Sequence, residues 1–254
     1  MAPSSAEATL LDGCCLVYMT GSRLYGCADP SSDRDLRGIV APTRMDYIEL
    51  TRPKEHTVSD GMDVQTWSLH HWCDMFAKGS PNALEIALLP DPAILHEDNL
   101  GRLLRDTARN GLHAGFIPHL MHYAHGQHHQ YERGEQPGKR LMHAVRVMRL
   151  AFELADNGRA GLEDPDTKQL LRIRHGAYVE GETEYRRLEE RLKQAEPTRL
   201  LPAQASDGWD KDLKMLALKA ALDATPEKQS NGVKEKNDRQ PTGCDKTRRL
   251  YIAP

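Results

Sequence analysis

The spacing of the hydrophobic residues changes near Ser68 and divides the chain into two regions. Before Ser68, short apolar or alternating runs are typical of strands, and the expected strands are residues 14–19, 35–40 and 62–67. A short helical turn is expected at 22–26. After Ser68, apolar residues recur every three to four positions, which predicts helices and almost no further strand.

Capping and helix-breaking residues set the ends of the expected helices. Ser68 can cap the first helix and Gly79 follows its end, Pro81 can begin the second, and Gly111 and Gly158 follow the ends of two others. The expected helices are 68–78, 82–89, 97–110, 115–132, 139–157, 166–175, 182–194 and 207–224.

These elements predict the α+β fold class. We expect an α/β-type N-terminal unit at 11–80, with a sheet of three to five strands and helices. A sheet this small cannot cover both of its faces, so the all-helical C-terminal part at 81–225 should pack on it and form the other wall of a cleft. Residues 226–254 contain few apolar side chains, which predicts a disordered tail.

Composition and charge narrow the class of protein. The net charge of −3 excludes a molecule that is basic as a whole, so any site for a polyanion must be a local patch. No apolar run is long enough for a transmembrane helix, and the first residues lack the features of a signal peptide. Five cysteines without a Cys-x-x-Cys pair fit reduced thiols, so we expect a cytoplasmic protein without a membrane partner.

The candidate chemistry begins at a Gly-Ser turn, Gly21-Ser22, directly after the first strand. Its backbone N–H groups and hydroxyl can bind phosphate oxygens. Asp33 and Asp35 are two positions apart and project to the same face of an extended chain. Two adjacent carboxylates repel each other unless a cation lies between them, and hard oxygen ligands suit Mg²⁺.

The expected strand at 62–67 carries a further acidic residue that could join this pair. Asp63 is the preferred residue because the segment around it alternates apolar and polar side chains. Asp60 and Glu55 are alternatives, although Asp60 precedes Gly61 and is more typical of a turn.

The helix at 139–157 carries apolar residues on two sides, which predicts a central position. Lys139, His143 and Arg146 share one of its faces. This face is either a solvated basic surface or a surface that binds the phosphates of a nucleotide. A largely buried helix should not carry unpaired cations without an anion, which favours phosphate binding.

Other polar residues near these motifs have two interpretations each. Arg23 and Tyr25 either position a nucleotide or pack locally, and Arg37 pairs with a carboxylate or a phosphate. Glu85 lies in an apolar helix and needs a partner, for which Lys78 or a basic residue of 139–157 is expected.

Histidines gather in the helix at 115–132, and they are His119, His122, His125, His128 and His129. Three of them share one face that could hold a metal, but no Cys or carboxylate completes a ligand set. A polar helix face is the favoured interpretation.

The run from Gly21-Ser22 to Asp33 and Asp35 resembles the nucleotidyltransferases of the DNA polymerase β superfamily. The similarity covers about 12–220 and includes the Asn-Ala-Leu-Glu segment at 82–85 and the Lys-x-x-x-His-x-x-Arg helix. Within the superfamily it resembles the predicted nucleotidyltransferases of bacteria and phages first noted as associates of a phage RNA ligase.

The resemblance implies a reaction. A nucleoside monophosphate would pass from an NTP to an acceptor hydroxyl, and pyrophosphate would leave. The resemblance implies two Mg²⁺ ions, with Mn²⁺ as an alternative, held by Asp33, Asp35 and Asp63, and Asp63 would help to deprotonate the acceptor. The acceptor is an RNA end, a protein or a small molecule, and the link to RNA ligation favours RNA. The oligomeric state stays open.

Two other functions agree with the same residues. One is a non-catalytic nucleotide-sensing or protein-binding module that keeps the fold, and Mg²⁺-dependent nucleotide binding without pyrophosphate release would identify it. The other is a toxin–antitoxin component, which would co-purify with a partner.

Overall fold

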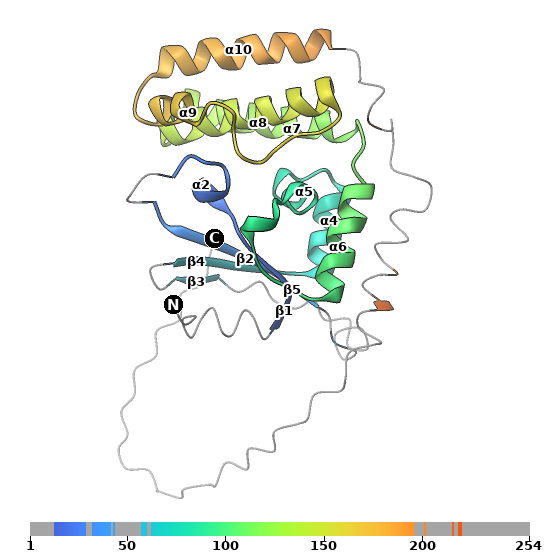
Figure 1. Ribbon diagram of the computed structural model, residues 1–254. Coiled ribbons are helices and arrows are strands. Elements are labelled where there is room, and N and C mark those ends of the chain that lie inside the picture. Colours follow the sequence, from blue (N-terminus) through green and yellow to red (C-terminus); the bar gives the residue numbers. More distant parts are fainter. Residues whose placement is uncertain are drawn as a thin grey trace, which may run out of the picture. The chain divides into compact units, whose positions relative to one another are not determined.

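The computed structural model describes residues 13–28, 32–41, 43, 57–59, 62–195, 201, 215, 218 and 219. Within this part the chain forms a mixed sheet and a set of helices, as the α+β prediction requires (Figure 1). None of the described helices combines the length and the apolar character that crossing a membrane requires.

The sheet has five strands in the order β3-β4-β2-β1-β5. The strands are β1 (Cys14–Met19), β2 (Arg34–Val40), β3 (Thr57–Ser59), β4 (Met62–Ser68) and β5 (Ile94–Glu97). β2 and β4 run parallel, while the other neighbouring pairs are antiparallel. β1 is flanked on both sides and almost wholly buried, which explains why its sequence is a continuous apolar run.

The helices differ in their neighbours. They are α2 (Gly21–Leu24), α4 (Leu69–Ala77), α5 (Pro81–Leu88), α6 (Asn99–Asn110), α7 (Phe116–Glu132), α8 (Pro137–Asn157), α9 (Thr167–Arg174) and α10 (Tyr178–Gln194), with a 3-10 turn η1 at Asp91–Ala93. α4 and α6 pack against the strands, whereas α8 contacts α7, α9 and α10. α8 is therefore central among the later helices, as its two apolar sides predict (Figure 1).

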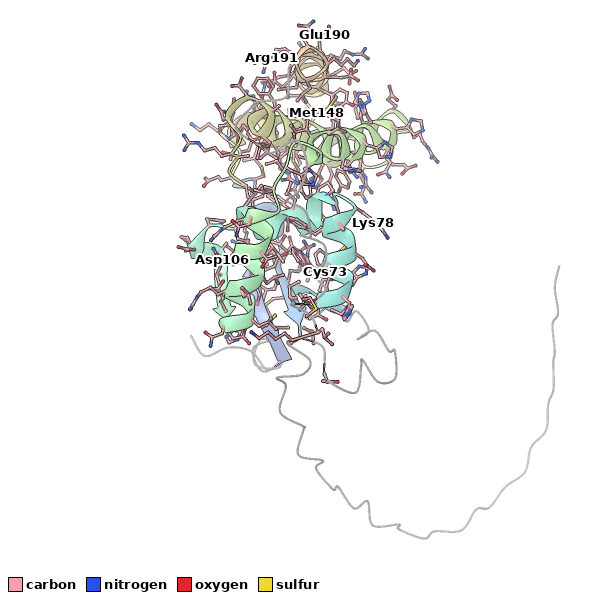
Figure 2. All side chains as sticks on the ribbon, turned by 90° about the vertical axis from the view of Figure 1, so that its right-hand side faces the viewer. Cys73, Lys78, Asp106, Met148, Glu190 and Arg191 are labelled. Carbon is pink, nitrogen blue, oxygen red and sulfur yellow. The ribbon has the colours of Figure 1, made fainter. Side chains whose placement is uncertain are left out.

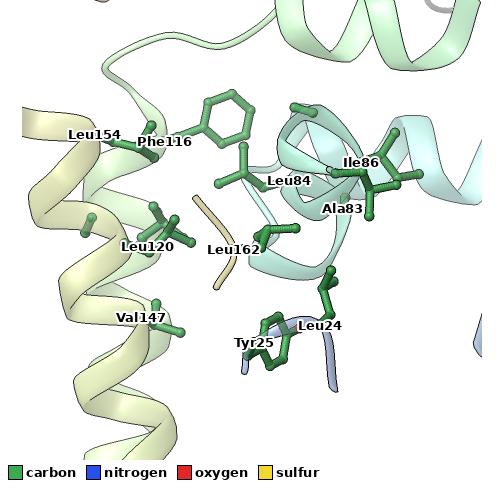
Figure 3. Close-up of a cluster of buried hydrophobic side chains, with 14 of the residues drawn as sticks. Leu24, Tyr25, Ala83, Leu84, Ile86, Phe116, Leu120, Val147, Leu154 and Leu162 are labelled. Atoms are coloured by element: carbon green, nitrogen blue, oxygen red, sulfur yellow. The ribbon is translucent and has the colours of Figure 1, made fainter. Parts of the chain in front are cut away.

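A continuous hydrophobic core joins the Gly-Ser turn to the helices. Figure 3 shows Leu24 and Tyr25 near side chains of α5, α7 and α8, and Leu162 lies among them. Met148 of α8 is fully buried among the helices, while Glu190 is exposed on the outer side of α10 (Figure 2). The element that carries the turn is thus packed on the same core as the helices.

The prediction of almost no strand after Ser68 is wrong for Ile94–Glu97. This short segment becomes β5 because it pairs with the edge of β1, a contact that no local pattern reveals. The helix expected at 97–110 consequently begins at Asn99, where Asp98 caps it by accepting a hydrogen bond from the Gly101 N–H at 2.8 Å. The last described long helix begins at Tyr178 rather than at 182.

Some predictions fall outside the described residues. They include the tail at 226–254, most of the helix at 207–224, and the alternative carboxylates Asp60 and Glu55. Met215, Leu218 and Lys219 are helical within the expected last helix.

Candidate active site

A cavity of about 390 Å³ lies between the sheet and the helices. From the sheet side it is lined by Gly21, Ser22, Asp33, Asp35 and Asp63, and from the helix side by Lys139, His143 and Arg174. Its volume suits a small ligand. The wall formed by the sheet carries these acidic side chains together with Arg37, and the wall formed by the helices carries basic ones.

The Gly-Ser turn follows β1 directly and lies against β2. The Thr20 N–H donates to the Asp35 carbonyl at 2.9 Å, and Gly21 has a positive φ of 67°. A Cβ atom at position 21 would overlap the Asp35 carboxylate. Gly21 is therefore required both for its backbone conformation and for the space that the Asp35 side chain takes.

The parallel pairing of β2 and β4 brings two of the predicted carboxylates together. Asp35 is in register with Asp63, so their side chains leave neighbouring strands on the same face. Asp33 precedes β2 by one residue and lies on the same cavity. Burial raises the pKa of Asp35, and the charges of Asp63 and Asp33 raise it further.

These three residues fit a hard divalent cation in their chemistry. Mutual repulsion of the carboxylates is relieved by a positive ion, and all the donor atoms are oxygens. In the described part of the chain, no three His, Cys, Asp or Glu side chains already converge as a complete ligand set. The carboxylates would therefore adjust their side-chain torsions to bind an ion.

The opposite wall is basic and contains a neutral histidine. Lys139 lies in the first turn of α8, and His143 lies one turn further along. Burial, together with the nearby charges of Arg146 and Lys139, lowers the pKa of His143 to about 3. His143 is therefore an uncharged hydrogen-bonding group at neutral pH.

Arg146, the third predicted residue of this face, does not line the cavity. Its guanidinium stacks on the Tyr25 ring at 3.6 Å from the centroid. Arg23 also points elsewhere, because it donates to the carbonyl oxygens of Ser32 at 3.0 Å and Asp33 at 3.3 Å. Arg23 thus holds the segment that carries Asp33, and phosphate binding by Arg23 and Arg146 stays a prediction.

A buried carboxylate, Glu85, connects α5 to the Gly-Ser turn. It accepts hydrogen bonds from the Thr20 hydroxyl at 3.0 Å, the Tyr25 hydroxyl and the Arg37 guanidinium at 2.8 Å. Glu85 is 3% exposed, and Arg37 also stacks on Trp67 at 4.0 Å. Three members of this set of four hydrogen-bonded residues, Thr20, Tyr25 and Arg37, also line the cavity, so the set, the Glu85 network, borders it.

The prediction of a partner for Glu85 was wrong. Arg37 of β2 forms the ion pair, and neither Lys78 nor a basic residue of α8 does so. Arg37 and Glu85 are 48 residues apart, so no local pattern indicates this contact. Arg37 was expected to pair with either a carboxylate or a phosphate, and in the structure it pairs with the Glu85 carboxylate. Tyr25 packs locally between Glu85 and Arg146.

Two histidines of α7, His125 and His128, pack against α10. His128 contacts Glu182 at 2.7 Å and stacks on Tyr185, whose hydroxyl lies 2.7 Å from His125 Nδ1. His122 and His129 are exposed. These contacts fit the favoured interpretation of a polar helix face.

Arg174 is the main cavity residue that the sequence did not indicate. It is the last residue of α9 and reaches the cavity because α9 packs against the start of α8. The only signal in the sequence was Gly138: a Cβ atom there would overlap the Arg174 carbonyl oxygen. A glycine near the start of a helix can mark a close backbone approach.

The neutral state of His143 leads to a pH-dependent stability. Folding lowers the pKa of His143, so below pH 6.5 the unfolded chain takes up a proton at this residue more readily than the folded protein does. The protein therefore has its full stability above pH 6.5 and loses stability as the pH falls toward 3. His143→Gln should remove a slope of at most about 1.4 kcal/mol per pH unit below that point. Urea unfolding at pH 7, 6 and 5 measures this slope. His122→Gln, at an exposed position, is the control, and equal slopes in wild type and His143→Gln would contradict the prediction.

The fold and the site together define a class of protein. A Gly-Ser turn packed on an Asp-x-Asp strand, with a third carboxylate on the parallel neighbour, is the arrangement of DNA polymerase β superfamily nucleotidyltransferases. The pattern of the RNA repair pathway DNA polymerase beta family (RlaP) matches residues 13–171, more than half of the chain. The chain belongs to this family. No curated protein matches the chain.

Proposed function

We propose that the protein transfers a nucleoside monophosphate from an NTP to an acceptor hydroxyl and releases pyrophosphate. The observation that carries this proposal is the pair Asp35 and Asp63 beside Gly21, across one cavity from Lys139 and Arg174. Carboxylates alone would bind a metal ion, whereas carboxylates that face Lys and Arg side chains across a cavity suit a polyphosphate with a metal ion bound to it.

The chain's own residues have distinct tasks in this reaction. The Gly21-Ser22 turn offers N–H and O–H donors to phosphate oxygens, and His143 offers an uncharged ring nitrogen. The oxygen of the acceptor hydroxyl attacks the α-phosphorus, and Asp63 accepts the proton that this hydroxyl loses. The bond from the α-phosphorus to the bridging oxygen breaks, and pyrophosphate leaves with both bond electrons.

Asp33, Asp35 and Asp63 would hold Mg²⁺, or Mn²⁺ in its place. When bound, the metal neutralises phosphate charge and makes the attacking hydroxyl more acidic. Positioning and charge stabilisation then provide most of the rate, because phosphoryl chemistry needs little covalent help from the protein.

An RNA end is the acceptor that we favour, since the family is described as part of an RNA repair pathway. We also place the reaction in the cytoplasm. The described cysteines, Cys14, Cys15, Cys27 and Cys73, are buried free thiols, which agrees with a reducing compartment.

The test is pyrophosphate release from each of the four NTPs with Mg²⁺ and RNA oligonucleotides that end in a 3′-hydroxyl. Release by the wild type should disappear in the Asp33→Ala, Asp35→Ala double variant, and labelled RNA should lengthen by one or more nucleotides. Nucleotide binding without release would instead indicate a nucleotide-sensing module. Release that needs a co-purified protein, rather than RNA, would indicate a toxin–antitoxin component.

A further inference from the structure

We propose that Arg174 and Lys139 form a clamp that binds the terminal phosphates of the NTP from the helix side of the cavity. This inference rests on the proposed function and adds a binding residue to it. Arg174 lies beyond residues 13–171, the part of the chain that matches the family pattern. The clamp would therefore use a residue that the family match does not cover.

Backbone packing brings the two side chains to one place. Lys139 follows Gly138 in the first turn of α8, and Arg174 ends α9. Any side chain at position 138 would overlap the Arg174 carbonyl oxygen, so the two backbones touch there. Both Lys139 and Arg174 line the cavity opposite the carboxylates of the sheet.

Within the described residues the charges of this pair are only partly balanced, because Lys139 acts on Asp35 at a distance and partly offsets the rise that burial causes in the pKa of that carboxyl. Neither Lys139 nor Arg174 has a carboxylate within ion-pair distance in that part of the chain, although both line the cavity. Other arginines nearby are paired: Arg149 contacts Asp164 at 2.6 Å, and Arg172 contacts Glu180 at 2.7 Å. Two unpaired cations on the wall of a cavity favour a ligand with several negative charges.

The positions of the side chains also decide which arginine can bind phosphate in the clamp. Arg146, on the same helix as Lys139, is stacked on Tyr25 and does not line the cavity. A guanidinium can form a bidentate contact to phosphate, while an ammonium acts as a point charge. Arg174 would thus supply the directional contact and Lys139 the additional charge.

The test compares Arg174→Ala, Arg174→Lys and Lys139→Ala with Arg172→Ala as the control. Arg172 is two positions away on the same helix, and its side chain is paired with Glu180 outside the cavity. The two readouts are the KM for the NTP and the Kd for inorganic tripolyphosphate by calorimetry. Arg174→Ala should raise both roughly 10- to 100-fold, and Arg174→Lys should recover part of the loss. Arg172→Ala should change them by about twofold or less.

Melting curves of each variant show whether it is folded, and Arg174→Lys keeps the test valid if the alanine variant is not. Unchanged KM and Kd in folded Arg174 variants of an active enzyme overturn the clamp and leave the transferase intact. Tripolyphosphate binding that depends on Arg174, in a protein that releases no pyrophosphate, supports the clamp and contradicts the transferase. No tripolyphosphate binding by the wild type overturns the clamp.

Discussion

Asp35→Asn is expected to lower the rate of nucleotidyl transfer at least roughly 1,000-fold, because under the proposed function this carboxylate holds a metal ion worth several kcal/mol of transition-state stabilisation. The substitution keeps the size and shape of the side chain. Its contacts with the Gly21 backbone should therefore be preserved. The measurement is single-turnover transfer at saturating NTP and Mg²⁺.

The same substitution should make the metal-free protein slightly more stable. Ionised Asp35 faces Asp63 and Asp33 and is partly buried, so its charge costs folding free energy at neutral pH. Removing the charge should raise the Tm by a few degrees at most, while added Mg²⁺ should raise the Tm of the wild type more than that of the variant.

The control for this pair of measurements is Asp156→Asn, which removes a carboxylate at an exposed position of α8. It should leave the activity, the Tm and the response to Mg²⁺ unchanged. A lower Tm for Asp35→Asn without metal would show that the carboxylate is stabilised by contacts in the folded protein. Full activity of the Asp35→Asn variant would show that the Asp35 carboxylate takes no part in the reaction.

Glu85→Ala should destabilise the protein by about 3–5 kcal/mol, because Arg37 would remain buried without its carboxylate. The Arg37 side chain is only 12% exposed and has little access to water. The Thr20 and Tyr25 hydroxyls would lose their acceptor at the same time. Urea unfolding monitored by circular dichroism gives the change in the free energy of unfolding.

A matched ion pair on the surface provides the control. Glu180 pairs with Arg172 at the same kind of distance, but the two side chains are 34% and 55% exposed. Glu180→Ala should cost less than about 1 kcal/mol. If both alanine variants lost similar stability, the Glu85 network would contribute no more than a surface ion pair.

The sequence predicted those parts of the site that are close together along the chain. Gly21 and Asp35 belong to one motif, whose resemblance to the superfamily implied a shared site, and both line the cavity. Alternating side chains identified the strand that carries Asp63, while its position beside Asp35 was implied by the same resemblance and is confirmed by the pairing of β2 with β4. The roles assigned to these residues await the experiments above.

The features that were missed depend on contacts between distant segments. β5 exists because it pairs with β1, Glu85 pairs with Arg37 from 48 residues away, and Arg174 reaches the cavity through the contact of α9 with α8. None of these segments carries a local pattern that determines its partner. Helical spacing alone grouped Arg146 with Lys139, although the ring of Tyr25 holds the Arg146 guanidinium away from the cavity.

The overlap between position 21 and the Asp35 carboxylate makes the effects of mutations at the two positions interdependent. While Asp35 is present, any larger residue at 21 meets both its side chain and an unfavourable φ. Once Asp35 is replaced by a small residue, only the φ of 67° still disfavours a side chain there. A lineage that abandons the chemistry would therefore lose the aspartate first, and the glycine would become easier to replace only afterwards.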